Sequence, residues 1–166
     1  PGEDRLSLLQ RNTSVFRSIA EQLDRHAPEA ILLIASNPVD VLTYLAIRYS
    51  GLPAKQVIGS GTVLDSSRFR YMLSDRCNVD ARNVHAYILG EHGDSEVAAW
   101  SLVHLSGVPL NDFCRGCEIE LGKKERKEIT DSVRDSAYHI IDYKGATYYA
   151  IGMALTRIAG AILRNQ

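Results

Sequence analysis

A continuous apolar run at residues 30–35, AILLIA, is the feature that most limits what this chain can fold into. Pro28 and Asn37 bound the run, and both residue types are typical of turns. A short run without polar alternation is typical of a parallel strand that is covered on both faces. We therefore expect an α/β protein in which this strand belongs to a parallel sheet.

Helix-like and strand-like patterns alternate along the rest of the 166-residue chain. Apolar residues recur every three or four positions in the predicted helices, whereas short apolar runs mark the predicted strands. No internal repeat or low-complexity tract interrupts this order. We expect helices at residues 6–27, 39–49, 65–76, 125–143 and 147–164, and strands at residues 30–35, 57–58, 84–89 and 97–103.

Composition narrows the partners that we expect. Apolar residues make up 45% of the chain and the net charge is -1, so neither nucleic acid nor a membrane surface is indicated as a partner. No apolar run reaches the roughly 18 residues that a membrane-spanning helix needs, and the residues that follow Pro1 do not have the basic and apolar pattern of a signal peptide. Three cysteines, an odd number, are typical of a reducing compartment. We expect a cytoplasmic protein.

Two of these cysteines form a C-x-x-C motif at Cys114 and Cys117. A structural zinc site needs two further ligands at a matching spacing, and no second C-x-x-C or paired histidine follows. A thioredoxin-like motif would begin a helix after a strand, whereas we expect a surface linker here. We interpret the two residues as incidental thiols and expect no metal site.

A histidine between glycines follows the apolar run at residues 84–89, in the segment Gly90-Glu91-His92-Gly93. Glycine leaves room for a ligand and adopts positive φ, so its flanks let a substrate approach the ring. Such a histidine can act as a general acid or base near neutral pH, or as a metal ligand. The alternative is a solvated histidine in a turn.

A second polar pair lies on the predicted helix at residues 65–76. Asp65 and Arg68 are three residues apart and therefore lie on one face of that helix. A carboxylate near His92 would fix the tautomer of the ring, and an arginine beside it could bind a substrate carboxylate through two parallel hydrogen bonds. The alternative is an ordinary ion pair on a solvated helix.

Four motifs together carry a resemblance to a known family. They are Ser36-Asn37-Pro38-Val39-Asp40, the glycine-rich GSGT at residues 59–62 with LDSSRFR at residues 64–70, Gly90-Glu91-His92-Gly93-Asp94, and KGATYY at residues 144–149. In order and spacing they resemble the L-lactate dehydrogenase branch of the lactate/malate dehydrogenase family, and its bacterial members in particular. The resemblance covers nearly all of the chain and implies a central piece, without the Gly-rich dinucleotide loop before Pro1 and without the last strands and closing helix after Gln166.

This resemblance implies a domain organisation. The chain would contain the second half of a Rossmann-type parallel-sheet domain joined to part of an α+β substrate domain. Residues 1–59 would belong to the dinucleotide-binding domain and residues 60–144 to the substrate domain. Residues 145–166 would form a helix that packs between the two domains.

The resemblance also implies a reaction, the reversible transfer of hydride between NADH and pyruvate. His92 would donate a proton to the carbonyl oxygen of pyruvate, and Asp65 would stabilise the imidazolium. Arg68 would bind the substrate carboxylate. Arg5 matches the mobile-loop arginine that polarises the carbonyl, although the residues alone are equally consistent with a solvated arginine near a helix start.

Further binding residues follow from the same resemblance. Asn37 would contact the substrate and the nicotinamide ribose, and Ala35 and Ser36 would help to bind NAD at the carboxyl end of a parallel strand. Thr147 would line the pocket near the substrate methyl group. The alternatives are an Asx-Pro turn at Asn37 and a helix threonine that bonds to its own backbone at Thr147.

Regulation and specificity remain open at this stage. Arg70 and His85 match the positions at which allosteric bacterial members bind fructose 1,6-bisphosphate across a subunit interface, and the family implies a homotetramer. The residue that separates pyruvate from oxaloacetate would lie before Pro1. Alternatives are therefore a malate or other 2-hydroxy acid dehydrogenase, or a catalytically silent module that serves oligomerisation.

Overall fold

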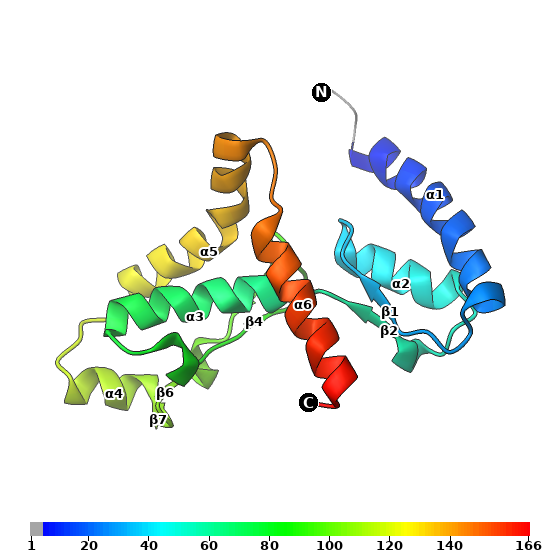
Figure 1. The fold of residues 1–166 in the computed structure, drawn as a ribbon. Helices are drawn as coiled ribbons and strands as arrows, with labels where there is room; N and C mark the ends of the chain where they lie inside the picture. Colours follow the sequence, from blue (N-terminus) through cyan, green and yellow to red (C-terminus); the bar gives the residue numbers. More distant parts are fainter. Residues whose placement is uncertain (1–4) are drawn as a thin grey trace. The chain divides into compact units, whose positions relative to one another are not determined.

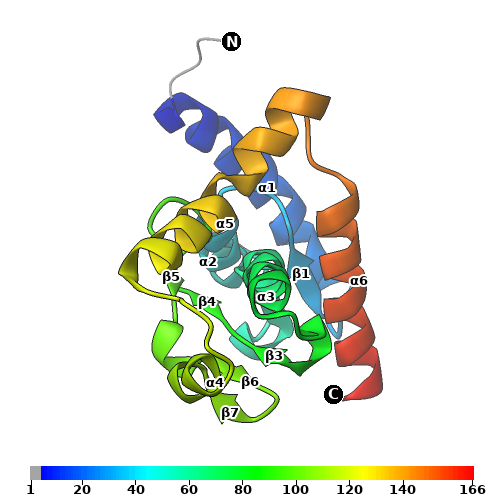
Figure 2. The same ribbon diagram turned by 90° about the vertical axis from the view of Figure 1, so that its left-hand side faces the viewer.

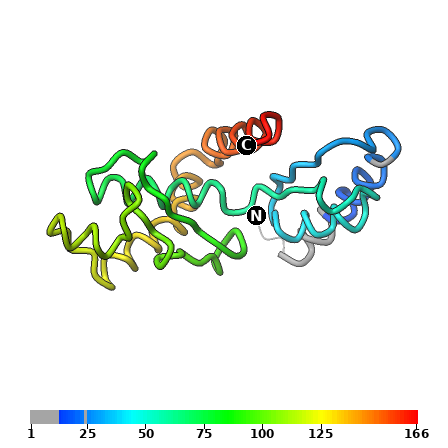
Figure 3. Tube along the Cα trace, turned by 90° about the horizontal axis from the view of Figure 1, so that it is seen from below, coloured from blue at the N-terminus to red at the C-terminus, as the bar shows by residue number. Residues whose placement is uncertain are grey.

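The structure is a computed structural model that describes the backbone of residues 5–166 and the side chains of residues 13–23 and 25–166. It divides into two compact units, Pro1–Gly61 and Thr62–Gln166. Figure 3 shows the Cα trace continuing from the first unit into the second near residue 61. Among the described residues, no helix has both the length and the apolar content needed to cross a membrane.

The first unit contains a parallel pair of strands joined by a helix. Helix α1 (Arg5–His26) precedes strand β1 (Leu32–Ile34), helix α2 (Val39–Tyr49), a 3-10 turn (Ala54–Gln56) and strand β2 (Val57–Gly59). β1 and β2 pair in parallel, and α2 contacts both strands and α1 (Figure 1). The α/β class and the parallel strand predicted from the apolar run are thus confirmed.

A close approach between α2 and β2 explains one glycine of this unit. A Cβ atom on Gly59 would lie 2.5 Å from Oγ1 of Thr43, which is closer than any unstrained contact. The Thr43 hydroxyl donates a hydrogen bond to the Val39 carbonyl at 2.7 Å and is therefore fixed in place. Glycine at position 59 lets the helix pack directly on the strand.

The second unit is built around helix α3 (Val63–Cys77). Helices α5 (Lys123–Lys144) and α6 (Tyr149–Arg164) both contact α3, which Figure 2 shows nearly end-on. Two small antiparallel sheets complete the unit, together with helix α4 (Leu110–Gly116). One sheet pairs β4 (Ile88–Leu89) with β5 (Val97–Ala98), and the other has the order β3 (Val84–His85), β6 (His104–Leu105), β7 (Val108–Pro109).

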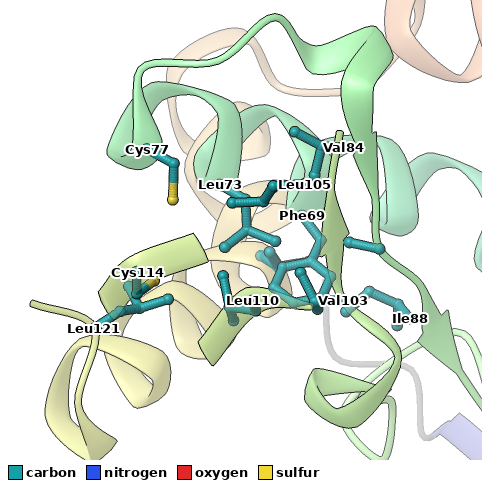
Figure 4. Packing of buried hydrophobic residues seen from close by; sticks show 12 residues of the cluster. Phe69, Leu73, Cys77, Val84, Ile88, Val103, Leu105, Leu110, Cys114 and Leu121 are labelled. Carbon is teal, nitrogen blue, oxygen red and sulfur yellow. The ribbon is translucent and has the colours of Figure 1, made fainter. Parts of the chain in front are cut away.

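The core of the second unit fixes α3 against these sheets. Phe69 on α3 is fully buried, and its ring meets Trp100 edge-to-face with 4.8 Å between the ring centroids. Leu73, one turn further along α3, packs in the same cluster with side chains from the strands and α4 (Figure 4). Helix α3 is therefore the element on which this unit is assembled.

Three local predictions for this unit were wrong. The strand predicted at residues 84–89 is two short strands, because the chain changes partner between them: β3 pairs with β6, whereas β4 pairs with β5. The strand predicted at residues 97–103 ends at Ala98 and continues as a 3-10 turn, Trp100–Leu102. The C-x-x-C motif lies at helix α4 instead of a linker, where Cys114 is buried and Cys117 is exposed.

Candidate active site

The start of α3 is attached to strand β4 by side-chain hydrogen bonds. The Thr62 hydroxyl donates to the Ile88 carbonyl at 2.7 Å, and the Ile88 amide donates to Oγ of Ser66 at 2.9 Å. These bonds satisfy backbone groups of a strand end that would otherwise be buried without partners. They also hold the first turn of α3, which carries Asp65, beside the loop that follows β4.

That loop, residues 90–96, brings His92 back toward α3. Gly90 and Gly93 have φ values of 90° and 142°, which side chains other than glycine rarely adopt. The Ser95 hydroxyl donates to Oε2 of Glu91 at 2.5 Å, and the Glu96 amide donates to the Gly93 carbonyl at 3.1 Å before β5 begins. The glycines predicted to expose the histidine are thus the residues that allow the loop to turn.

Asp65 joins the histidine and the arginine in one cluster. Nδ1 of His92 lies 2.6 Å from Oδ2 of Asp65, and Nη1 of Arg68 lies 3.1 Å from Oδ1 of the same carboxylate. The Asp65 side chain is 3% exposed, Arg68 14% and His92 27%. A buried carboxylate can only accept here, so Nδ1 carries the proton and Nε2 is the ring atom that can exchange a proton with a substrate.

The electrostatics of this cluster suit proton transfer. A carboxylate in contact with the ring favours the imidazolium form and fixes the ring orientation. Arg68 uses Nη1 on Asp65 and is itself partly exposed, so its guanidinium also offers donors to an anionic ligand. The arrangement can therefore hold a carboxylate and protonate a neighbouring oxygen.

Sequence reasoning missed a second carboxyl group at this cluster. Glu96 is buried, and burial, with Asp65 as the next cause, raises its pKa to about 7. Ligand atoms of Asp65, His92 and Glu96 all lie within 4.8 Å of one another. A charged residue just before the apolar segment at residues 97–103 was the available signal. Because Nδ1 and Oδ2 already lie at hydrogen-bond distance, we interpret the group as an acid/base cluster.

The other predicted site residues lie elsewhere in the chain. Asn37 is exposed just after β1, together with Ser36 and the half-buried Ala35, at the carboxyl end of the parallel pair. Thr147 is half-buried between α5 and α6. Arg5 is the first residue of α1, but its side chain lies outside the described residues.

A cavity of about 770 Å³ lies on the second unit, lined by residues of α3, β3, β4 and α6. Four basic side chains line it: Arg70, Arg82, His85 and Arg157. Arg70 donates to the Ala86 carbonyl at 3.2 Å, and burial, followed by the charge of Arg157, lowers its pKa. Several positive groups around one cavity are typical of an anion site. Arg70 and His85, which the sequence resemblance paired, both line it.

The fold and the cluster of Asp65, His92 and Arg68 together indicate an α/β protein with an acid/base site. A parallel βαβ unit with exposed polar residues at its carboxyl edge is typical of an open α/β sheet that binds ligands there. An Asp–His pair beside an arginine is suited to acid/base chemistry on a carboxylate-bearing substrate.

Comparison with family models identifies the particular family. The model of the lactate/malate dehydrogenase alpha/beta C-terminal domain matches residues 62–166, and the model of the lactate/malate dehydrogenase NAD binding domain matches residues 1–59. The chain belongs to the lactate/malate dehydrogenase family, as the sequence resemblance predicted.

Individual relatives agree with this assignment. An L-lactate dehydrogenase of Treponema denticola is 55% identical over 166 residues, covering 99% of this chain and 53% of the relative. L-lactate dehydrogenase 1 of Clostridium acetobutylicum is 51% identical, covering 100% and 53%. A solved lactate dehydrogenase from a Medee basin deep-sea metagenome library superposes with a TM-score of 0.95 at 47% identity, covering 99% of this chain and 52% of that one. The chain therefore spans about half the length of the relatives it matches.

Proposed function

We propose that this chain carries the acid/base site and the carboxylate-binding site of an NAD-dependent L-lactate dehydrogenase, which reduces pyruvate reversibly to lactate. The observation that carries the proposal is the cluster in which Asp65 contacts His92 at 2.6 Å and Arg68 at 3.1 Å. Three relatives, including the two sequences named above, are L-lactate dehydrogenases, and their names support pyruvate over oxaloacetate or other 2-oxo acids.

In the proposed reaction His92 donates the proton on Nε2 to the carbonyl oxygen of pyruvate. Asp65 stabilises the imidazolium before the transfer and keeps the ring oriented after it. Arg68 binds the substrate carboxylate and thereby sets the distance between the carbonyl and His92. In the reverse direction neutral His92 accepts the hydroxyl proton of lactate.

The edge of the first unit fits a nicotinamide cofactor. Ser36 and Asn37 are exposed polar residues beyond the carboxyl end of a parallel strand, and the small side chain of Ala35 precedes them. We assign these residues to binding the nicotinamide ribose, with Asn37 also oriented toward the substrate. Bound NADH supplies the hydride for the carbonyl carbon.

Further assignments belong to the same proposal. We assign Arg5 to polarising the substrate carbonyl and Thr147 to the wall of the substrate pocket. We propose a cytoplasmic homotetramer, and the free thiols at Cys77, Cys114 and Cys117 support a reducing compartment. The division into residues 1–59, 60–144 and 145–166, with the last helix packing between domains, stays a prediction. A silent oligomerisation module is the remaining alternative.

The direct test is a spectrophotometric assay of NADH oxidation by the complete protein that contains this chain. We expect pyruvate to be reduced and oxaloacetate to be a poor substrate. His92→Asn removes the proton donor, and we expect kcat/KM for pyruvate to fall by about 100-fold to 10,000-fold with little change in the Kd for NADH. His104→Asn, in β6 and outside the cluster, is the matched control. Failure of the parent protein on every 2-oxo acid would support the silent module instead.

A regulatory site is a second proposal, favoured by the cationic cavity. We propose that Arg70 and His85 bind fructose 1,6-bisphosphate, because both line a cavity that Arg82 and Arg157 also make positive. A ligand that binds the active state better will lower the apparent KM for pyruvate.

Steady-state kinetics with and without fructose 1,6-bisphosphate test the regulatory proposal. We expect the double variant Arg70→Gln/His85→Gln to lose the response while the basal activity stays. Arg115→Gln, an exposed arginine outside the cavity, should keep the response. An unchanged KM in the parent protein would reject the regulatory site and leave the catalytic proposal intact.

A further inference from the structure

Glu96 is a buried carboxyl group, and one of its two side-chain oxygens has no hydrogen-bond partner among the described residues. The residue is 5% exposed and precedes β5, at the end of the loop that carries His92. Its Oε1 atom is buried, and no described residue donates a hydrogen bond to it. Buried polar atoms normally have such a partner, so an orphaned one in a cluster of reactive groups indicates a functional constraint.

Four charged or titratable groups surround this carboxyl. Asp65 and Arg68 face it from α3, His92 faces it from its own loop, and Arg134 faces it from α5. Nε of Arg134 is also buried without a hydrogen-bond partner among the described residues. Burial and the Asp65 carboxylate disfavour a charge on Glu96, whereas the three basic groups favour it.

These opposing effects leave Glu96 able to change its charge near neutral pH. Its pKa is raised to about 7, with burial as the main cause. Below that pH Glu96 is neutral, so Asp65 is the one negatively charged member of the two carboxyl groups, Asp65 and Glu96, beside His92. Above it, a second negative charge faces the same imidazole.

We propose that Glu96 is a positioning residue for His92. It is a second carboxyl group beside the Asp65–His92 pair, and its ionised form stabilises the protonated imidazole of His92. The inference rests on the proposed function of His92 as the proton donor. It adds a role for a residue that need not touch the substrate, because it acts through the charge it places beside the ring.

The consequence is a wider pH range for pyruvate reduction. Reduction needs protonated His92, and an additional anion within a few ångströms favours that form. As the pH rises through neutrality, Glu96 ionises and delays the loss of the His92 proton. Lactate oxidation needs neutral His92, so the same charge delays the onset of the reverse reaction.

The test compares pH profiles of the complete protein with those of Glu96→Gln. We expect the alkaline limb of kcat/KM for pyruvate, and the acid limb for lactate oxidation, to move together toward lower pH by about one unit. A purely structural defect would lower both rates without moving either limb. Glu96→Asp keeps the charge, so both limbs should lie closer to their positions in the parent protein than they do in Glu96→Gln.

Glu91→Gln is the matched control. Glu91 belongs to the same loop but is exposed, so removal of its charge should leave both limbs in place because solvent screens it. If Glu96→Gln does not fold, Glu96→Met removes the same charge without leaving a buried amide unpaired.

A readout without turnover separates this inference from the proposed function. The rate of His92 modification by diethyl pyrocarbonate, followed by peptide mass spectrometry, reports the neutral ring at each pH. We expect its midpoint to fall by about one unit in Glu96→Gln. A parent protein inactive on pyruvate but with this shift would reject the dehydrogenase assignment and retain the inference. Unmoved midpoints in a folded Glu96→Gln or Glu96→Met protein would overturn it.

Discussion

The two compact units differ in how completely they form their proposed sites. In Thr62–Gln166, Asp65, Arg68 and His92 are held to one another by direct hydrogen bonds and charge contacts. In Pro1–Gly61, Asn37 is an exposed residue placed only by its position after β1. The residues proposed for proton transfer are thus in contact within one unit, whereas those proposed for cofactor binding share only a position at the end of a strand.

The same difference appears in the two hydrophobic cores. The core of the second unit joins α3, α4, α5 and four strands, and Phe69 and Leu73 of α3 lie within it. The core of the first unit gathers β1, β2 and α2 around Leu42. Because Asp65, Arg68 and Phe69 belong to the same turns of α3, core packing in the second unit also positions the site.

Paired truncations of the two cores test this link most strongly. We expect Phe69→Ala to destabilise the complete protein by about 4 kcal/mol and Leu42→Ala by about 3 kcal/mol. Phe69→Ala should also lower kcat for pyruvate, because α3 loses the contact beside Arg68, whereas Leu42→Ala should affect mainly stability. Denaturant unfolding and steady-state kinetics measure both effects. Equal loss of kcat in the two variants would contradict the coupling.

Arg68→Lys tests the proposed site of the second unit at a single side chain. Lysine keeps the charge but loses the planar fork, so it cannot hold Asp65 and a substrate carboxylate with the same geometry. We expect a loss of about 3 kcal/mol of transition-state stabilisation, on the order of a hundredfold in kcat/KM for pyruvate. Arg76→Lys, on the same helix and bonded to the Glu120 carbonyl, is the control. Near-parental activity of Arg68→Lys would exclude a bidentate role.

Sequence reasoning predicted the class of the fold, and it singled out Asp65, Arg68 and His92, which the structure brings together. The run at residues 30–35 and the helix at residues 39–49 were predictable because a covered parallel strand and an amphipathic helix each have a local pattern. The pairing of Asp65 with His92 was implied by the family resemblance, and the structure places the two side chains in contact.

Other features could not be predicted because distant residues determine them. The break between β3 and β4 arises from a change of strand partner, which no local pattern records. Residues 108–116 form β7 and α4, although their short apolar segments are weak signals. Glu96 was missed because a charged residue is normally exposed, and the groups that act on its charge come from α3, α5 and its own loop, which are distant or unpatterned in the sequence.

In the first unit, a smaller effect should follow from Gly59→Ala. The added methyl group would meet Oγ1 of Thr43 at 2.5 Å, and α2 would have to move away from β2. We expect a loss of about 2–3 kcal/mol in the free energy of unfolding. In a Thr43→Ala background the cost should shrink, since the nearest remaining atom is the residue 43 Cβ at 3.4 Å. Additive effects in this double-mutant cycle would contradict a direct contact.

The smallest predicted effect concerns the pH dependence of stability in the second unit. The pKa of Glu96 is raised from 4.5 to about 7, so the folded state binds more protons than the unfolded state between those values. Stability from this group is therefore fully present below the unfolded value and is lost as the pH rises through neutrality.

Replacement of the titrating group should flatten that dependence. We expect the difference in unfolding free energy between about pH 5 and about pH 8 to shrink by about 2 kcal/mol in Glu96→Gln. Thermal unfolding at fixed protein concentration measures it, with Glu91→Gln as the exposed control. A parallel pH dependence in the parent and Glu96→Gln would mean that Glu96 ionises as readily in the folded chain as in the unfolded one. In that case burial and the neighbouring Asp65 carboxylate would leave the proton affinity of Glu96 unchanged, and the raised pKa of this group would be wrong.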